Sequence, residues 1–231
     1  MNLKIKWKVW GFFKGEKTMQ HDFRYVSKEQ AKELKKELRN LIHDVQNEVR
    51  EYFTFQYRLI GSASRDMITY DAKSNKGFDF DVNFYVNDDE ERFAPEEIRQ
   101  IFFEAIRKIS IHYGYSKFEN STRVITIKQV NYFWPRIEYS CDFAIVYDCP
   151  DGRQQYIRYN KNRNTYTWEY QPNGYPLLEE KMKWIKQKGL WKRLEDYYIE
   201  KKNHNEIANK KSRAIFAEAV HEICMKNGYK R

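Results

Sequence analysis

The sequence predicts an α+β fold in which a mixed β-sheet is flanked by helices and followed by a C-terminal helical part. Residues 78–86 and 136–147 alternate apolar with polar side chains, and a period of two indicates half-buried strands. Residues 27–52 and 94–113 instead repeat apolar side chains every three or four positions, which is typical of amphipathic helices. From residue 176 onward only helical patterns occur.

The first elements are a strand, a helix and a second strand. Residues 2–13 alternate apolar side chains with lysines, which predicts a strand with a lysine-lined outer face. These lysines either contact a polyanion or protect an edge strand from pairing with another molecule. The helix begins at Ser27, which forms a capping-box pattern with Gln30. Residues 53–60 form the next strand, which ends at Gly61.

A polar loop with phosphate-binding features follows that strand. Gly61 and Ser62 allow backbone amides and a hydroxyl to approach a phosphate group, because glycine has no Cβ in the way. Further along the loop, Arg65, Lys73 and Lys76 are candidates for phosphate contacts, although a charged loop residue is more often simply solvated.

Three aspartates are the candidate catalytic residues. Asp79 and Asp81 project from one face of the same strand, with their Cα atoms roughly 6–7 Å apart. Their oxygens can converge on one hard cation or on two Mg²⁺ ions. In the strand 136–147, Asp142 lies on the polar face, and it would join the other two if the strands are neighbours.

These motifs resemble the DNA polymerase β-like nucleotidyltransferase superfamily: Gly61-Ser62, a strand with Asp79 and Asp81, and a later strand with Asp142. The strand 122–127, shortly before the third aspartate, makes the chain most similar to the branch of oligoadenylate synthetases and bacterial cyclic-oligonucleotide synthases. The resemblance implies a nucleotidyltransferase-type mixed sheet. The loop between Ser62 and Asp79 is longer than in most members, and Phe78 stands where many carry Ser or Thr.

The resemblance also implies an activity: Mg²⁺-dependent transfer of a nucleoside monophosphate from an NTP, most often ATP, to an acceptor hydroxyl. Asp79 and Asp81 would hold two Mg²⁺ ions, which Mn²⁺ can replace, and Asp142 would bind the ion nearer the acceptor and help to deprotonate its hydroxyl. In relatives the C-terminal helical part closes over the nucleotide. A lysine there touches the phosphates and an aromatic residue stacks on the base, for which Lys181 and Tyr175 are the candidates, together with Trp168.

The sequence leaves four alternatives for the acceptor: an RNA or tRNA end, a second nucleotide, a protein side chain or a small antibiotic. RNA or another nucleotide is favoured, because basic flanking segments would repel a cationic antibiotic and because the chain is short for a cyclic-oligonucleotide synthase. Two alternatives have no NTP-dependent chemistry. One is a catalytically silent, antitoxin-like binding module with the same fold, and the other is a metal-dependent nuclease using the same aspartates.

The expected organisation is a catalytic domain over 1–171 and a helical region over 172–231 that packs on it. The catalytic domain would end in an aromatic and basic hairpin, 155–159 with 165–170, which either contacts bases and phosphates or is an ordinary stable hairpin. A short linker precedes three helices, which we expect over 176–188, 190–202 and 205–227.

Composition limits the class of protein. Hydrophobic residues make up 41% of the 231 residues and aromatic residues 17%, which is ample for a core. No run of 18 apolar residues and no signal-peptide pattern occurs, so we expect a soluble cytoplasmic protein without a membrane partner. The net charge is +9, with an acidic middle between basic ends, which fits either a phosphate-binding surface or a general lysine bias. Three cysteines and five histidines show no zinc-ligand or disulfide spacing.

Overall fold

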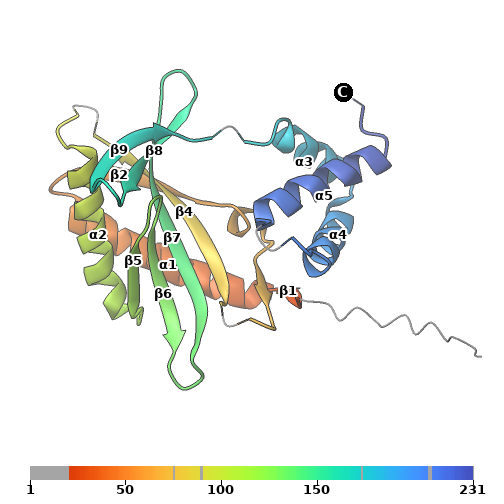
Figure 1. Cartoon of the computed structure of the whole chain (residues 1–231), viewed down its shortest axis with the longest axis horizontal. Coiled ribbons are helices and arrows are strands. Elements are labelled where there is room, and N and C mark those ends of the chain that lie inside the picture. The colour runs from red at the N-terminus through yellow and green to blue at the C-terminus, as the bar shows by residue number, and fades with distance from the viewer. Residues whose placement is uncertain (1–20, 75, 89–90, 173, 208–209, 231) are drawn as a thin grey trace, which may run out of the picture.

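The molecule combines a mixed β-sheet, two helices that cover it and a cluster of three further helices (Figure 1). The structure, a computed structural model, describes residues 21–230 apart from 75, 89–90, 173 and 208–209. The α+β class expected from the sequence is confirmed, with helices flanking the sheet and a helical part at the C-terminal end. The strand expected over 2–13 lies outside the described residues.

The elements follow one another in a mixed order along the chain. The strands are β1 (Phe23–Tyr25), β2 (Thr54–Ile60), β3 (Thr69–Asp71), β4 (Phe78–Asn87), β5 (Lys117–Asn120), β6 (Ile125–Asn131), β7 (Arg136–Asp148), β8 (Gln154–Asn160) and β9 (Thr165–Tyr170). The helices are α1 (Lys28–Val49), the 3-10 turn η1 (Ala63–Arg65), α2 (Pro95–His112), α3 (Leu178–Gln187), α4 (Trp191–Asn203) and α5 (Ser212–Lys226).

The large sheet has the strand order β2-β4-β7-β6-β5, and β8 extends it by pairing with the end of β7 and with β9. Its central pair, β4 and β7, is parallel, whereas the other pairs are antiparallel. The expected antiparallel pairing of the strands around 122–130 and 136–147 is confirmed, as is the hairpin of β8 and β9.

One face of the sheet is buried against α1 and α2. The alternating apolar residues of β4, with Phe80 and Phe84 fully buried, pack there beside Phe102 of α2. Helix α1 begins as its sequence predicts, because the Ser27 hydroxyl accepts a hydrogen bond of 3.1 Å from the Gln30 amide. The opposite face of β4 therefore carries its polar residues away from these two helices.

The three C-terminal helices enclose a second hydrophobic core. Its buried side chains come from all three helices and include Ile185, Leu194, Phe216 and Val220. Met67, from the loop after η1, is buried in the same cluster. We call α3, α4 and α5 the helical cluster. In Figure 1 it lies at the end of the molecule opposite α2.

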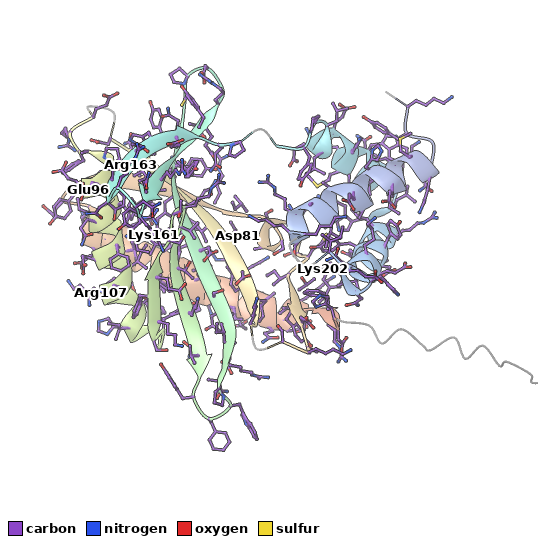
Figure 2. All side chains as sticks on the ribbon, in the orientation of Figure 1. Asp81, Glu96, Arg107, Lys161, Arg163 and Lys202 are labelled. Atoms are coloured by element: carbon purple, nitrogen blue, oxygen red, sulfur yellow. The ribbon has the colours of Figure 1, made fainter. Side chains whose placement is uncertain are left out.

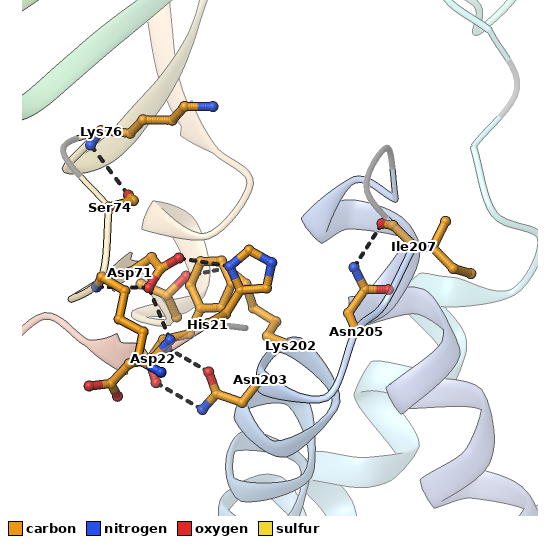
Figure 3. Close-up of polar contacts among 12 residues, drawn as sticks. His21, Asp22, Asp71, Ser74, Lys76, Lys202, Asn203, Asn205 and Ile207 are labelled. Carbon is orange, nitrogen blue, oxygen red and sulfur yellow. Dashed lines mark hydrogen bonds and ion pairs between the residues drawn. The ribbon is translucent and has the colours of Figure 1, made fainter. Parts of the chain in front are cut away.

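The long segment between Ser62 and Asp79, which the sequence indicates as a loop, is partly folded. It contains η1 and β3, and β3 pairs with β1 in an antiparallel ribbon that the sequence did not predict. The ribbon contacts α4 through Asn203, whose side chain accepts from the Phe23 amide at 2.6 Å and donates to the Phe23 carbonyl at 3.2 Å (Figure 3). The long loop thus contributes, through Met67 and through the pairing of β3 with β1, to the surface on which the helical cluster packs.

Among the residues that the structure describes, no helix combines the length and the apolar composition that crossing a membrane requires.

Candidate active site

The three aspartates lie on one face of the sheet at its parallel centre. In the register of β4 and β7, Asp81 is directly opposite Asp142, and Asp79 is opposite Ser140. Neighbouring strands are about 4.8 Å apart, and directly paired residues point to the same side of a sheet. The two aspartates of β4 and the one of β7 therefore form a compact row, on the face that α1 and α2 leave uncovered.

Neighbouring hydroxyls hold two of these carboxylates in place. Thr126 of β6, which is opposite Asp142 in the ladder, donates a hydrogen bond of 2.6 Å to its Oδ1 atom. Ser140 donates to Asp79 Oδ1 in the same way. These hydroxyl residues were not among the candidates predicted from the sequence. Both belong to the alternating polar face of their strands, and this signal could have identified them.

Burial and crowding raise the pKa values of two of the carboxyls. Burial, together with repulsion by Asp142 and Asp79, raises the pKa of Asp81 to about 6, and Arg65 opposes this shift. Burial also raises the pKa of Asp142, which the Thr126 hydrogen bond counteracts and repulsion by Asp79 reinforces. Three carboxylates that repel one another in a partly buried row form a site in which a cation would be strongly favoured.

Gly61 lies directly against this row. Its φ is +63°, and a Cβ atom at this position would be 2.6 Å from Asp81 Oδ2. Glycine is therefore required both for the backbone conformation and for the space beside the carboxylate. The turn after it is held by Lys35 of α1, whose Nζ donates to the Ala63 carbonyl at 2.7 Å. The Gly-Ser turn predicted as a phosphate-binding element thus borders the aspartates.

Arg65 faces the boundary between the aspartates and the helical cluster. Its guanidinium lies over the Phe216 ring of α5, 4.2 Å from the ring centroid, and its buried Nε atom has no hydrogen-bond partner among the described residues. Burial lowers its pKa, whereas Tyr198, Glu179 and Asp81 act to raise it. A half-buried cation whose Nε atom has no partner in the described part of the chain, next to a carboxylate row, is suited to an anionic ligand.

The contacts that Lys76, Lys181 and Tyr175 make are with residues other than the aspartates. Lys76 is exposed, and its backbone amide bonds to Ser74 Oγ at 3.3 Å. Lys181 Nζ lies 3.0 Å from His221 Nδ1 on α5. Tyr175, before α3, is 5.5 Å from the guanidinium of Arg213 of the same helical cluster, measured to the ring centroid. Their predicted contacts with a nucleotide stay predictions.

Lys202 is a buried cation that the sequence analysis passed over. Its side chain on α4 is 3% exposed, its Nζ donates to Thr69 Oγ1 at 2.6 Å, and it lies 3.8 Å from the centroid of the Phe23 ring. Figure 2 shows Lys202 and Asp81 on the two sides of the junction between sheet and helices. The sequence does contain a signal of this burial. Leu194, Tyr198 and Lys202 recur every four residues, so they lie along one buried stripe of α4.

The residues present suit a hard divalent cation by their chemistry, since carboxylate oxygens are the ligands that Mg²⁺ and Mn²⁺ prefer. No group of three His, Cys, Asp or Glu side chains within the described part of the chain is already drawn together closely enough to enclose a metal ion. The fit therefore rests on the shared face, the direct pairing of Asp81 with Asp142 and the raised pKa values.

No protein-family model and no curated protein sequence matches the chain. Its fold, however, is that of the DNA polymerase β-like nucleotidyltransferases, as solved structures with the same arrangement show. The resemblance noted in the sequence is thereby confirmed for the fold.

The similar structures are bacterial nucleotide-binding proteins. Vibrio cholerae DncV in its 3′-deoxy ATP bound form matches with a TM-score of 0.59 and 15% identity, over 85% of this chain and 67% of that one. Escherichia coli DncV in its 3′-deoxy GTP bound form matches with a TM-score of 0.59 and 13% identity, over 85% and 68%. Vibrio cholerae DncV cyclic AMP-GMP synthase with the linear intermediate pppA(3′,5′)pG matches at 0.51 and 11%, over 76% and 60%. The chain thus spans 60–68% of the length of these three proteins.

Proposed function

We propose that this protein is a nucleotidyltransferase that moves a nucleoside monophosphate from an NTP, ATP being the expected donor, to a hydroxyl of RNA or of another nucleotide. The observation that carries the proposal is the direct pairing of Asp81 with Asp142 on adjacent parallel strands, with Asp79 on the same face and Gly61 against it. A binding module without chemistry has no need for a partly buried row of mutually repelling carboxylates.

The likeness to nucleotide-bound structures supports the same reading. The similar DncV structures contain analogues of ATP or GTP and, in one case, a linear dinucleotide intermediate. Those ligands are found in those proteins. They support an NTP as the donor for this chain because the similarity in fold covers 85% of it in the two DncV structures with bound nucleotide analogues.

In the proposed reaction the acceptor oxygen attacks the α-phosphorus of the NTP. A new phosphorus–oxygen bond forms, the bond to the oxygen bridging the α- and β-phosphates breaks, and pyrophosphate leaves with the electron pair. Asp142, whose Oδ1 is held by Thr126, has Oδ2 to accept the proton of the attacking hydroxyl. Asp79 and Asp81 would hold divalent cations, which when bound supply neutralising charge to the attacking and leaving oxygens.

The test is transfer from α-labelled NTPs with Mg²⁺ or Mn²⁺, with and without total RNA, and mass spectrometry of the products. We expect Asp81→Asn and Asp142→Asn to lower turnover by about a hundredfold or more, since roughly 1.4 kcal/mol of transition-state stabilisation corresponds to tenfold in rate. Asp196→Asn, an α4 carboxyl that is 64% exposed, is the matched control and should leave turnover unchanged.

Two outcomes would contradict the proposal. If no NTP yields a labelled product under any of these conditions, and none shifts the melting temperature with Mg²⁺, the silent binding module is the better account. Cleavage of RNA without any NTP, lost in Asp81→Asn, would instead identify a nuclease.

A further inference from the structure

A cavity of about 300 Å³ lies between the first half of α1 and the chain that follows η1. Its apolar lining comes from Val26, Ala31 and Ile68, and the Val26 amide donates to the Ile68 carbonyl at 2.9 Å. Val26 and Ile68 are buried, whereas Ala31 is partly exposed. This volume is at the lower end of the roughly 300–1,000 Å³ that small-molecule sites occupy. We call it the α1 cavity.

Four cationic side chains that recur every three or four residues along α1 line this cavity, so they lie on one side of the helix. They are Lys28, Lys32, Lys35 and Arg39. Asp66 is the one acidic side chain among the described residues that line the cavity. Like charges at this spacing repel one another and destabilise a helix. A bound anion would remove the repulsion, so the α1 cavity favours a negatively charged ligand.

Three of these four cations are available to a ligand. Lys28, Lys32 and Arg39 are exposed, and no side-chain hydrogen bond or ion pair engages them within the described part of the chain. The Lys35 side chain, in contrast, is 14% exposed, and its Nζ is paired with Asp66 Oδ1 at 2.5 Å. The cavity therefore combines three positive charges that are not neutralised with an apolar surface.

This combination indicates the chemical class of the ligand. A single carboxylate cannot neutralise three cations, whereas a chain of phosphates carries several negative charges. Lysine binds phosphate as a point charge, and arginine binds it through two parallel hydrogen bonds. The apolar lining suits a flat body such as a nucleobase. A nucleoside polyphosphate has both parts, whereas a nucleic-acid duplex would contact the cations through its backbone and leave the apolar lining unused.

The α1 cavity is linked to the candidate active site through Lys35. Besides pairing with Asp66, its Nζ donates to the Ala63 carbonyl at 2.7 Å, in the turn that follows Gly61. Gly61 itself lies against Asp81. Phosphates bound in the cavity would compete with Asp66 for Lys35. Because this lysine holds the turn, a shift of its side chain would change the turn beside the aspartates.

We propose that the α1 cavity is a second nucleotide site, separate from the aspartates, which binds a nucleoside polyphosphate and transmits this binding to the Gly61 turn through Lys35. An effect on turnover rests on the proposed function. The binding and its effect on the turn do not, because both are measured without catalysis.

The first experiment measures the fluorescence anisotropy of N-methylanthraniloyl-ATP with the full chain in EDTA. Without divalent cations the carboxylate row repels a triphosphate, which leaves the α1 cavity as the favoured site. We expect the double variant Lys32→Gln, Arg39→Gln to bind at least about tenfold more weakly, since the loss of one charge-assisted hydrogen bond has an effect of this size.

The matched control is the double variant Lys36→Gln, Arg50→Gln. Lys36 belongs to the same helix and Arg50 is its C-cap, both are exposed, and neither lines the cavity. The control removes the same charge and should bind the nucleotide like the wild type. An equal loss of affinity in the control would contradict the proposal, because the attraction would then come from the charge of the whole helix.

Ala31→Phe tests the cavity without changing any charge. The larger side chain fills the apolar part of the cavity, so we expect a similar loss of affinity. Circular dichroism establishes that each variant is folded. Wild-type affinity in Ala31→Phe or in the Lys32/Arg39 variant would overturn the proposal. So would loss of binding to an RNA duplex in these variants while nucleotide binding persists, since the cations would then serve a nucleic-acid backbone.

Hydrogen exchange tests the link to the turn. The amides of Arg65 and Met67 donate to the Ser62 carbonyl at 3.2 Å and 3.0 Å. We expect bound nucleotide to change their exchange rates in the wild type and not in the Lys32/Arg39 variant. Unchanged exchange with the nucleotide bound would refute the link through Lys35. No transfer occurs in EDTA, and the aspartate variants are scored separately, so failure of the proposed activity and failure of the second site give different results.

Discussion

The sheet and the helical cluster each have their own core, but the contacts that join them are of a different kind. In the sheet region the Phe84 ring packs against Phe55 and Phe102, with centroids 4.5 Å and 5.3 Å away. In the helical cluster Tyr198 packs edge to face on Phe216 at 5.5 Å. Both are densely packed apolar interiors of the kind that dominate folding stability.

The junction between the two regions combines polar contacts with the packing of Met67 and Tyr25 against the helical cluster. Lys202 of α4 contacts Phe23 and Thr69, Asn203 bonds to the Phe23 backbone, and Arg65 lies over Phe216. The aspartate row borders this junction. Arg65 acts on the pKa of Asp81 and Asp79 acts on the pKa of Lys202, so the junction brings positive charge beside the carboxylates.

The largest expected effect comes from removing one buried side chain in each core. Phe84→Ala should lower the free energy of unfolding by about 3–5 kcal/mol and destabilise the whole molecule, because Phe84 is at the centre of the sheet. Leu194→Ala should cost about 2–5 kcal/mol but unfold the helical cluster first. Hydrogen exchange measured along a denaturant series checks this. Equal loss of protection in β4 and α5 for Leu194→Ala would show a single cooperative unit.

A smaller effect is expected at the turn where the sheet meets the junction. Gly61→Ala places a Cβ 2.6 Å from Asp81 Oδ2, so it should displace the carboxylate and cost roughly 1–3 kcal/mol. Gly152→Ala is the matched control, because its φ is also positive, at +80°, but nothing lies within 4 Å of the new Cβ. Urea denaturation and the transfer assay should show a loss of activity for Gly61→Ala alone. Equal activity of the two variants would place the turn outside the site.

A further effect, seen only at alkaline pH, concerns the pH dependence of the junction. Burial lowers the pKa of Lys202 from 10.5 to about 8, although Asp71 on β3 and Asp79 on β4 act to raise it. Between these two pH values the unfolded chain holds a proton that the folded chain has released, so the folded state gains stability as the pH rises. Below about pH 8, Lys202 is protonated in both the folded and the unfolded state. Its buried charge then destabilises the folded state.

Lys202→Met removes this titration. We expect the wild type, compared with the variant, to gain up to about 3 kcal/mol of junction stability between pH 8 and pH 10. Lys192→Met, on the exposed face of the same helix, is the control and should keep the wild-type pH dependence. Parallel denaturation curves for wild type and Lys202→Met across this range would show that Lys202 does not lose its proton there.

Most of the sheet and the row of aspartates could be predicted from the sequence. Apolar and polar side chains alternate along these strands, and this alternation shows which face of each strand is buried. The pattern over 78–86 identifies the buried face of β4, and the opposite face then carries Asp79 and Asp81. The pairing of Asp142 with Asp81 follows from the same rule once the two strands are taken as neighbours. Ser27 was predictable for a similar reason, since a helix cap depends only on residues within one turn.

The ribbon and the junction could not be predicted in this way. β1 and β3 are three residues long and pair across about 46 positions of sequence, so neither is long enough to establish an alternating pattern. β5 was missed because its four residues are too few to distinguish from a turn. Lys202 was overlooked because a lysine in a helix is normally exposed, and only the tertiary contact with β3 makes this one buried.

The side chain of Asn203 presents one acceptor and one donor to Phe23, as a neighbouring strand would. A lone two-stranded ladder is barely stable in water, and this amide gives β1 a hydrogen-bonding partner on its other side. An unpaired strand edge can accept a strand from another chain, so Asn203 covers backbone groups of β1 that would otherwise be open to such pairing.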